Sequence, residues 1–168
     1  MDTTIALLIN GSLGLLGVVV GHFVTKHTYI FQRSYERKSD LITDLYKEVV
    51  RLEFELKKYL HFIGADLSGE SLEEKRKSLS KIKSDFQLFQ HKFWEVEIIL
   101  DDDVIKTIQE FLTKYIQITS KLSVSNLVQQ QGDTNYSFEQ WDESFKLATS
   151  DLVKIKEDLK EEFKRALK

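Results

Sequence analysis

Residues 5–24 read IALLINGSLGLLGVVVGHFV, and this stretch decides the fold because it contains no Asp, Glu, Lys or Arg. In an α-helix, about 20 residues span roughly 30 Å, which is the thickness of the hydrocarbon core of a bilayer. The sequence therefore predicts an N-terminal single transmembrane helix. We assign residues 1–28 to this anchor.

The apolar run has two other possible interpretations. A cleaved signal peptide needs a positively charged start and a small-residue cleavage site, whereas here Asp2 is the only charged side chain before the run and Lys26 follows it closely. A buried helix of a soluble domain is the second alternative, but an apolar run of about 18 residues or more exceeds what a small core uses. A membrane anchor agrees best with the pattern.

The charges around the run predict its orientation. Lys26, Arg33, Arg37 and Lys38 follow it with a single Glu36 among them, while only Asp2 precedes it. The positive-inside rule then places the C-terminus in the cytoplasm, as in a single-pass protein of the inner (cell) membrane. These basic residues form a candidate cluster facing anionic lipid, although topology alone also explains them. The lack of cysteine agrees with a reducing compartment.

One face of the predicted anchor collects its small and polar residues. At about 100° per residue, Asn10, Gly14, Gly17 and Gly21 fall within about 60° of one another. Such a face lets helices approach closely, and Asn10 would bond across the interface or face water. It is a candidate face for homo-oligomerisation or for lining a pore. The alternative is that glycine is simply common in membrane helices.

Residues 29–168 show the pattern of a cytoplasmic helical bundle. The chain has no proline, and after Gly21 its glycines are Gly64, Gly69 and Gly132, so long helices are permitted. Apolar residues recur at steps of three and four, as on amphipathic helices. We predict an all-α protein in which the anchor runs almost directly into an antiparallel four-helix bundle. The four stripes are Ile42, Leu45, Val49, Leu52, Leu56, Tyr59 and Ile63; Leu79, Ile82, Phe86, Phe89, Phe93 and Val96; Ile105, Ile108, Leu112, Tyr115 and Leu122; and Phe138, Trp141, Phe145, Ala148, Leu152, Ile155, Leu159 and Phe163.

Capping signals predict where the bundle helices begin. Residues 64–71 are typical of a loop, and Ser71 with Glu74 forms a Ser-x-x-Glu capping box that opens the second helix. Residues 101–103 are three aspartates, which we interpret as the start of the third helix rather than as a metal site.

The fourth helix is predicted to follow a long connection. Residues 123–136 are the longest polar stretch and predict a loop. Ser137 with Gln140 then repeats the capping-box pattern.

Common enzyme signatures are missing from the sequence. It has no cysteine nucleophile, no His-Glu-x-x-His, and neither of the glycine-rich phosphate motifs GxxxxGK and GxGxxG. We expect His61 and His91 to be surface residues, and we expect no catalytic residue, metal or cofactor. From residue 26 onward acidic residues slightly outnumber Lys and Arg, so direct nucleic-acid binding is not expected.

This layout, a membrane-tethered helical bundle of small size, resembles the accessory membrane proteins beside RNA-targeting CRISPR nucleases of type VI-B. Members of that group resemble divergent HEPN domains, whose ribonucleases carry Arg, four to six residues, and then His. Here Arg51 and His61 come nearest to that pattern, with nine residues between them.

The resemblance implies an oligomeric membrane protein that permeabilises or depolarises the membrane in prokaryotic antiviral defence. Its expected partners are the lipid bilayer, further copies of the chain and, as a candidate, an RNA-targeting nuclease effector. Two alternatives stay open: a degenerate HEPN ribonuclease tethered to the membrane, and a membrane scaffold that recruits a cytoplasmic partner.

Overall fold

The structure, a computed structural model, describes the backbone of residues 3–63 and 71–166. Side chains are described from residue 22 onward, apart from those of residues 23–24, 27, 30–31, 34, 62–63 and 72. Every element in these ranges is a helix. The chain divides into two compact units, Met1–Asp40 and Leu41–Lys168.

Helix α1 (Thr3–Lys58) is 56 residues long and continues as a short π-helix, η1 (Tyr59–Ile63). No proline interrupts this segment, and between Gly21 and Gly64 no glycine does so either. The predicted continuity between the apolar run and the first bundle helix is confirmed. The helical backbone at residues 5–24 also gives the geometry assumed for the glycine face.

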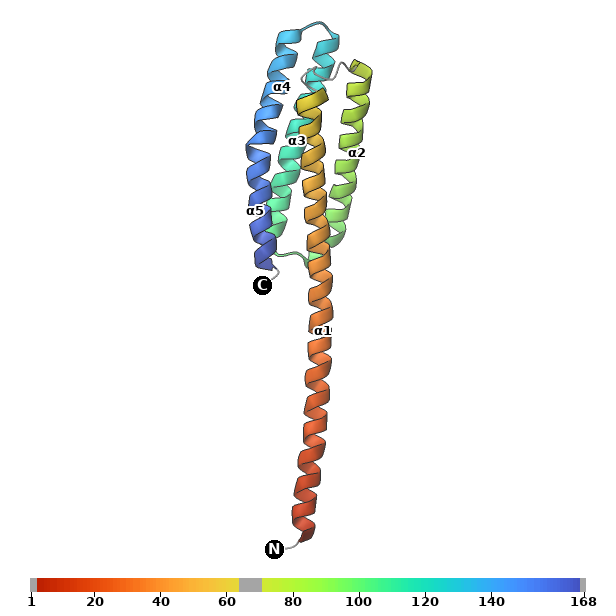
Figure 1. Cartoon of the computed structure of the whole chain (residues 1–168), viewed down its shortest axis with the longest axis vertical. Coiled ribbons are helices and arrows are strands. Elements are labelled where there is room, and N and C mark those ends of the chain that lie inside the picture. The colour runs from red at the N-terminus through yellow and green to blue at the C-terminus, as the bar shows by residue number, and fades with distance from the viewer. Residues whose placement is uncertain (1–2, 64–70, 167–168) are drawn as a thin grey trace. The chain divides into compact units, whose positions relative to one another are not determined.

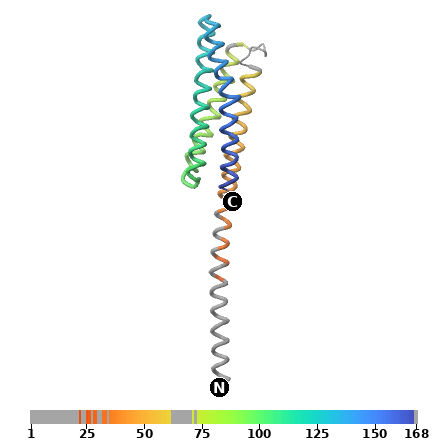
Figure 2. The backbone as a smooth tube through the Cα atoms, turned by 90° about the vertical axis from the view of Figure 1, so that its left-hand side faces the viewer, coloured from red at the N-terminus to blue at the C-terminus, as the bar shows by residue number. Residues whose placement is uncertain are grey.

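In the second unit, the helices run alternately up and down as an antiparallel bundle (Figures 1 and 2). The end of α1 is followed by α2 (Leu72–Val96), a 3₁₀ turn η2 (Glu97–Ile99) and α3 (Asp102–Gln130). Helices α4 (Thr134–Thr149) and α5 (Asp151–Ala166) lie in line and together form the fourth side of the bundle. The predicted all-α bundle is confirmed.

The predicted apolar stripes supply most of the core, and buried residues outside them, such as Phe111 and Ile118, complete it. Phe86 stacks on Tyr115 with ring centroids 4.6 Å apart, and Phe89 meets Phe111 edge to face at 6.0 Å. The Tyr115 hydroxyl donates to the backbone carbonyl of Leu52 at 3.2 Å, and burial raises the pKa of this phenol, so it stays a neutral donor. The aromatic rings therefore join three helices: α1, α2 and α3.

Two of the predicted helix starts are confirmed. The hydroxyl of Ser71 accepts from the backbone N–H of Glu74, and the Glu74 carboxylate accepts from the backbone N–H of Ser71 at 2.8 Å. The bonds that this carboxylate accepts from the backbone N–H and from the hydroxyl of Ser71 lower its pKa. Asp101 occupies the N-cap position of α3 without a side-chain capping bond, and Asp102 and Asp103 lie in its first turn.

The prediction of a loop over residues 123–136 is wrong. Helix α3 continues to Gln130, and Gly132 adopts a φ of 89° in the short turn before α4. The polar stretch is helical because its side chains find partners inside the bundle. The Ser125 hydroxyl donates to the Ser137 carbonyl at 2.8 Å, and the Ser137 hydroxyl donates to the Ser125 carbonyl at 2.9 Å.

The fourth helix also begins earlier than predicted. Its N-cap is Asp133, whose carboxylate accepts from the backbone N–H of Tyr136 at 3.1 Å, so Ser137 is not the cap. Phe138, assigned to the inward stripe, is 65% exposed, whereas Trp141 and Phe145 are partly buried. Ser137, rather than Phe138, lies against α3.

A break divides the predicted fourth helix into α4 and α5. The Thr149 hydroxyl donates to the carbonyl of Phe145 at 2.7 Å, and the Ser150 hydroxyl donates to that of Lys146 at 2.6 Å. Adjacent hydroxyls that bond back to the preceding turn compete with the helical ladder. Asp151 then opens α5 and forms an ion pair with Lys114 of α3 at 2.8 Å.

Across the side chains that the structure describes, no helix contains a stretch apolar enough to cross a membrane. The predicted transmembrane segment falls almost wholly on side chains outside that description, namely those of residues 5–21 and 23–24.

We expect Ser137→Leu to destabilise the bundle because α4 approaches α3 closely at this serine. The larger side chain would overfill the contact and remove the hydrogen bond that the Ser137 hydroxyl donates to the Ser125 carbonyl, a loss of about 2–4 kcal/mol. Urea unfolding of the full chain, followed by far-UV circular dichroism, measures it. Ser84 is exposed on α2, so Ser84→Leu is the matched control and should stay within about 0.5 kcal/mol of the parent. Equal effects of the two substitutions would contradict the close contact.

Candidate functional site

The predicted oligomerisation face lies on α1, within the first unit. The structure gives the helical backbone at Asn10, Gly14, Gly17 and Gly21, while what surrounds these positions lies outside the described residues. The role of this face therefore stays a prediction that rests on the sequence and on a helical backbone.

The predicted basic cluster follows on the same helix. Lys26, Arg33 and Arg37 are exposed, and Lys38 is half-buried. Glu36, the one acid among them in the sequence, accepts a hydrogen bond from the amide of Gln32 at 3.1 Å. Exposed cations next to an apolar run are suited to anionic phosphate headgroups.

Arg51, the arginine nearest to the ribonuclease pattern, forms ion pairs with two acidic residues. Arg51 pairs with Glu48 on its own helix at 2.8 Å and with Asp85 of α2 at 3.0 Å. These carboxylates raise the pKa of the guanidinium. The arginine therefore links α1 to α2.

The two bundle histidines are exposed, as expected, and both lie against aromatic rings. His61 meets Phe145 of α4 edge to face at 5.0 Å, and His91 meets Trp94 of its own helix at 5.6 Å. Neither is bonded to Arg51, and among the side chains that the structure describes no group of three or more His, Asp or Glu could hold a metal ion. Arg51 therefore does not form an Arg/His pair with His61 or His91.

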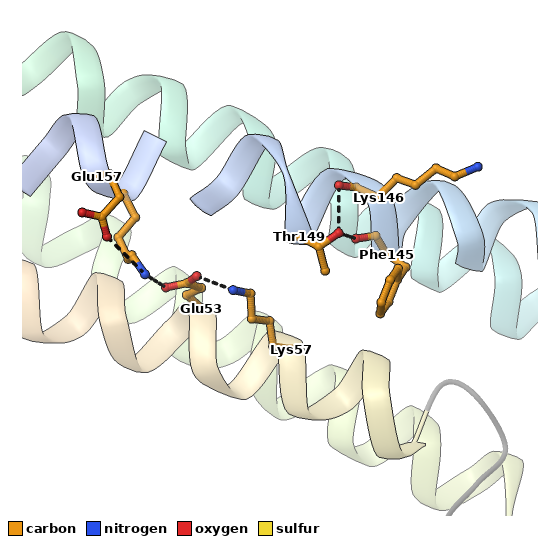
Figure 3. A network of polar contacts seen from close by, with 7 residues as sticks. Glu53, Lys57, Phe145, Lys146, Thr149 and Glu157 are labelled. Atoms are coloured by element: carbon orange, nitrogen blue, oxygen red, sulfur yellow. Dashed lines mark hydrogen bonds and ion pairs between the residues drawn. The ribbon is translucent and has the colours of Figure 1, made fainter. Parts of the chain in front are cut away.

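A buried carboxylate joins α1 to α5. Glu53 is 4% exposed and accepts from Lys57 at 2.7 Å and from Lys156 of α5 at 2.9 Å, as Figure 3 shows. Lys156 also lies 3.8 Å from Glu157. The bond to Glu53 raises the pKa of the Lys156 ammonium above that of a free lysine. The ion pair therefore stabilises the fold at pH values below the ordinary lysine pKa, and this contribution is lost as the pH rises through the raised pKa of Lys156. One negative charge between two cations makes this a structural contact rather than a catalytic acid.

A pocket of about 280 Å³ opens between α2 and α3. Arg76 and Lys83 lie on its α2 side, with Ser80 between them in sequence, and Ser123 and Asn126 lie on its α3 side. The Lys83 ammonium donates to the Ser123 hydroxyl at 2.6 Å. This is a concave site with two cations and several hydrogen-bonding groups, the kind of surface that receives a small polar ligand.

Sequence reasoning did not find this pocket. Arg76, Ser80 and Lys83 follow one another at steps of four and three, which places them on one face of α2. This spacing could have predicted the α2 side of the pocket. The opposite wall was missed because Ser123 and Asn126 were assigned to a loop, although both belong to α3.

No family model, no curated protein and no solved structure matches this chain.

We expect Glu53→Ala to destabilise the bundle by about 2–3 kcal/mol because it leaves two partly buried ammonium groups without their carboxylate. Urea unfolding of the full chain measures the loss. In the double variant Glu53→Met/Lys156→Met, stability should return to within about 1 kcal/mol of the parent, since an apolar pair can replace a buried ion pair.

The control for this variant is Glu73→Ala on α2. Glu73 pairs with Lys77 at 2.9 Å, but both side chains are mostly exposed. Such surface pairs contribute about 0–1 kcal/mol. A loss at Glu53 no larger than that at Glu73 would show that burial does not strengthen the contact.

Proposed function

We propose that the chain is a single-pass membrane protein whose anchor self-associates and perturbs the bilayer, with the helical bundle as its cytoplasmic interaction module. The observation that carries the proposal is the uncharged run at residues 5–24, with Asn10 and three glycines on one helical face. The unbroken helical backbone of α1 through this run supports the spacing on which the face depends.

The basic residues support the proposed orientation in the inner membrane. Lys26, Arg33 and Arg37 are exposed just beyond the run, on the side that the positive-inside rule assigns to the cytoplasm. The same residues would contact anionic headgroups of that leaflet.

The polar contacts of the bundle favour an interaction module over an enzyme. Arg51 is engaged by Glu48 and Asp85, and Glu53 by Lys57 and Lys156. Groups fixed in such contacts hold helices together and are not free to bind a scissile phosphate. We propose a role in prokaryotic antiviral defence because the predicted layout resembles that of type VI-B accessory membrane proteins, with an RNA-targeting nuclease as a candidate partner.

The degenerate ribonuclease and the scaffold remain the competing proposals. A ribonuclease needs His61, His91 or Arg51 for its phenotype, so substituting them would abolish function in a chain that still folds and inserts. A scaffold needs only attachment, so any unrelated anchor in place of residues 3–25 would preserve function. An oligomeric membrane-perturbing protein tolerates the histidine substitutions and does not tolerate the anchor exchange.

The topology is tested with a reporter fused after Lys168. We expect the fusion to be active only with a reporter that works in the cytoplasm, because the basic residues follow the apolar run. A matched reporter that works outside the cell should be silent at the same site. The opposite pattern would reverse the orientation.

The self-association is tested by filling the glycine face. Gly14→Leu, Gly17→Leu and Gly21→Leu should each weaken assembly, because a leucine side chain keeps the helix backbones apart. Leu16→Ala changes the opposite side of the helix and should be nearly silent. Native mass measurement in nanodiscs gives the subunit number, and ion flux in liposomes reports on a pore. A monomer rejects the proposal as a whole, whereas a non-conducting oligomer removes only the pore.

A further inference from the structure

The α2–α3 pocket contains positive charge that the described part of the chain does not neutralise. The Arg76 guanidinium donates to the side-chain carbonyl of Gln130 at 2.5 Å, and Lys83 donates to the hydroxyl of Ser123 at 2.6 Å. Both acceptors are neutral, and no described carboxylate forms an ion pair with either cation. Lys77, between them in sequence, instead pairs with Glu73. The two cations of the pocket therefore keep their charge available for an anion.

The hydrogen-bonding groups of the pocket suit phosphate oxygens. A guanidinium has five N–H donors and an ammonium has three, so one bond each to Gln130 and Ser123 leaves most of this capacity free. Ser80 and Ser123 add hydroxyl groups to the lining. Hydrogen bonds between cationic donors and anionic oxygens are the strong class, and arginine matches the geometry of phosphate especially well.

The shape of the pocket favours an elongated ligand over a simple inorganic anion. Arg76 and Lys83 are seven positions apart, which is about 10 Å along a helix. Leu79 and Leu127 form an apolar part of the lining, and Leu127 is 52% exposed. Such a surface can cover the organic part of a ligand while the cations hold its charged part.

A fixed polar group lies at the inner side. Asn126 is 8% exposed, and its amide nitrogen donates to the hydroxyl of Tyr59 at 2.9 Å. This bond holds the amide in place, and the group keeps a second N–H and a carbonyl oxygen for other partners. Prepositioned groups of this kind lower the entropy cost of binding.

We propose that the α2–α3 pocket binds a small organic phosphate carrying at least two negative charges. Arg76 and Lys83 hold the phosphate groups, and Leu79, Leu127 and Asn126 contact the organic part. The phosphate can belong to a soluble molecule or to a lipid headgroup, since both offer the same oxygens to the cations.

The proposal is tested by calorimetric titration of the full chain, held in phosphatidylcholine nanodiscs, with adenosine diphosphate as the probe. We expect saturable binding that weakens with added salt, and no binding of uncharged adenosine. Arg76→Gln and Lys83→Gln should each weaken binding about tenfold or more, because each removes a charged hydrogen bond. Lys77→Gln makes the same charge change on the same helix outside the pocket and should alter affinity by less than about twofold.

Ser80→Phe tests the pocket without changing the charge. Ser80 is exposed, so the substitution should leave the thermal unfolding temperature unchanged while it blocks the probe. A second arm replaces phosphatidylcholine with phosphatidic acid, whose phosphomonoester headgroup can carry two negative charges. A thermal shift in phosphatidic acid that needs Arg76 and Lys83, without binding of adenosine diphosphate, assigns the phosphate to a lipid headgroup. Binding of neither source, or binding that ignores these variants, overturns the proposal.

Discussion

An apolar stripe brings a helix into a bundle but does not fix the axial position of the helix relative to its neighbours. In this bundle, polar contacts between helices fix that position. Asp85 of α2 receives Arg51 of α1 at 3.0 Å, and Lys83 of α2 reaches Ser123 of α3 at 2.6 Å. The fourth side is held by Lys114 of α3 to Asp151 at 2.8 Å. Because each pair of groups can meet at only one axial position, these contacts select a single arrangement of otherwise similar leucine and phenylalanine layers.

The seam between α3 and α4 extends this principle to the backbone. Ser125 and Ser137 exchange hydrogen bonds with each other's carbonyls, and Ser144 donates to the carbonyl of Ile118 at 3.4 Å. Ala148 adds a further small side chain that is fully buried. Small residues let these two helices approach closely. Polar side chains can be buried here because the carbonyls of the neighbouring backbone are near enough to accept their hydrogen bonds.

The same seam explains how much of the fold could be predicted from the sequence. The stripes of α1, α2 and α3 were readable because large apolar residues recur with the helical period. The capping box at Ser71 was readable because both of its bonds are local. Ser125 and Asn126 were misread, since their partners Ser137 and Tyr59 are distant in sequence and a polar stretch without a visible partner resembles a loop. The α2–α3 pocket was missed for the same reason.

The placement of glycine separates the proposed association of the anchor from the simpler explanation that membrane helices are rich in glycine. Gly11, Gly14, Gly17 and Gly21 all lie within α1, whereas no other described helix contains a glycine. Each costs about 1 kcal/mol relative to alanine inside a helix. A general enrichment in glycine accounts for four glycines, but it predicts positions scattered around the helix. Instead, three of the four share one face with Asn10. The proposed association accounts for both features, since a second copy of the same helix would offer a close backbone and a hydrogen-bond partner for Asn10.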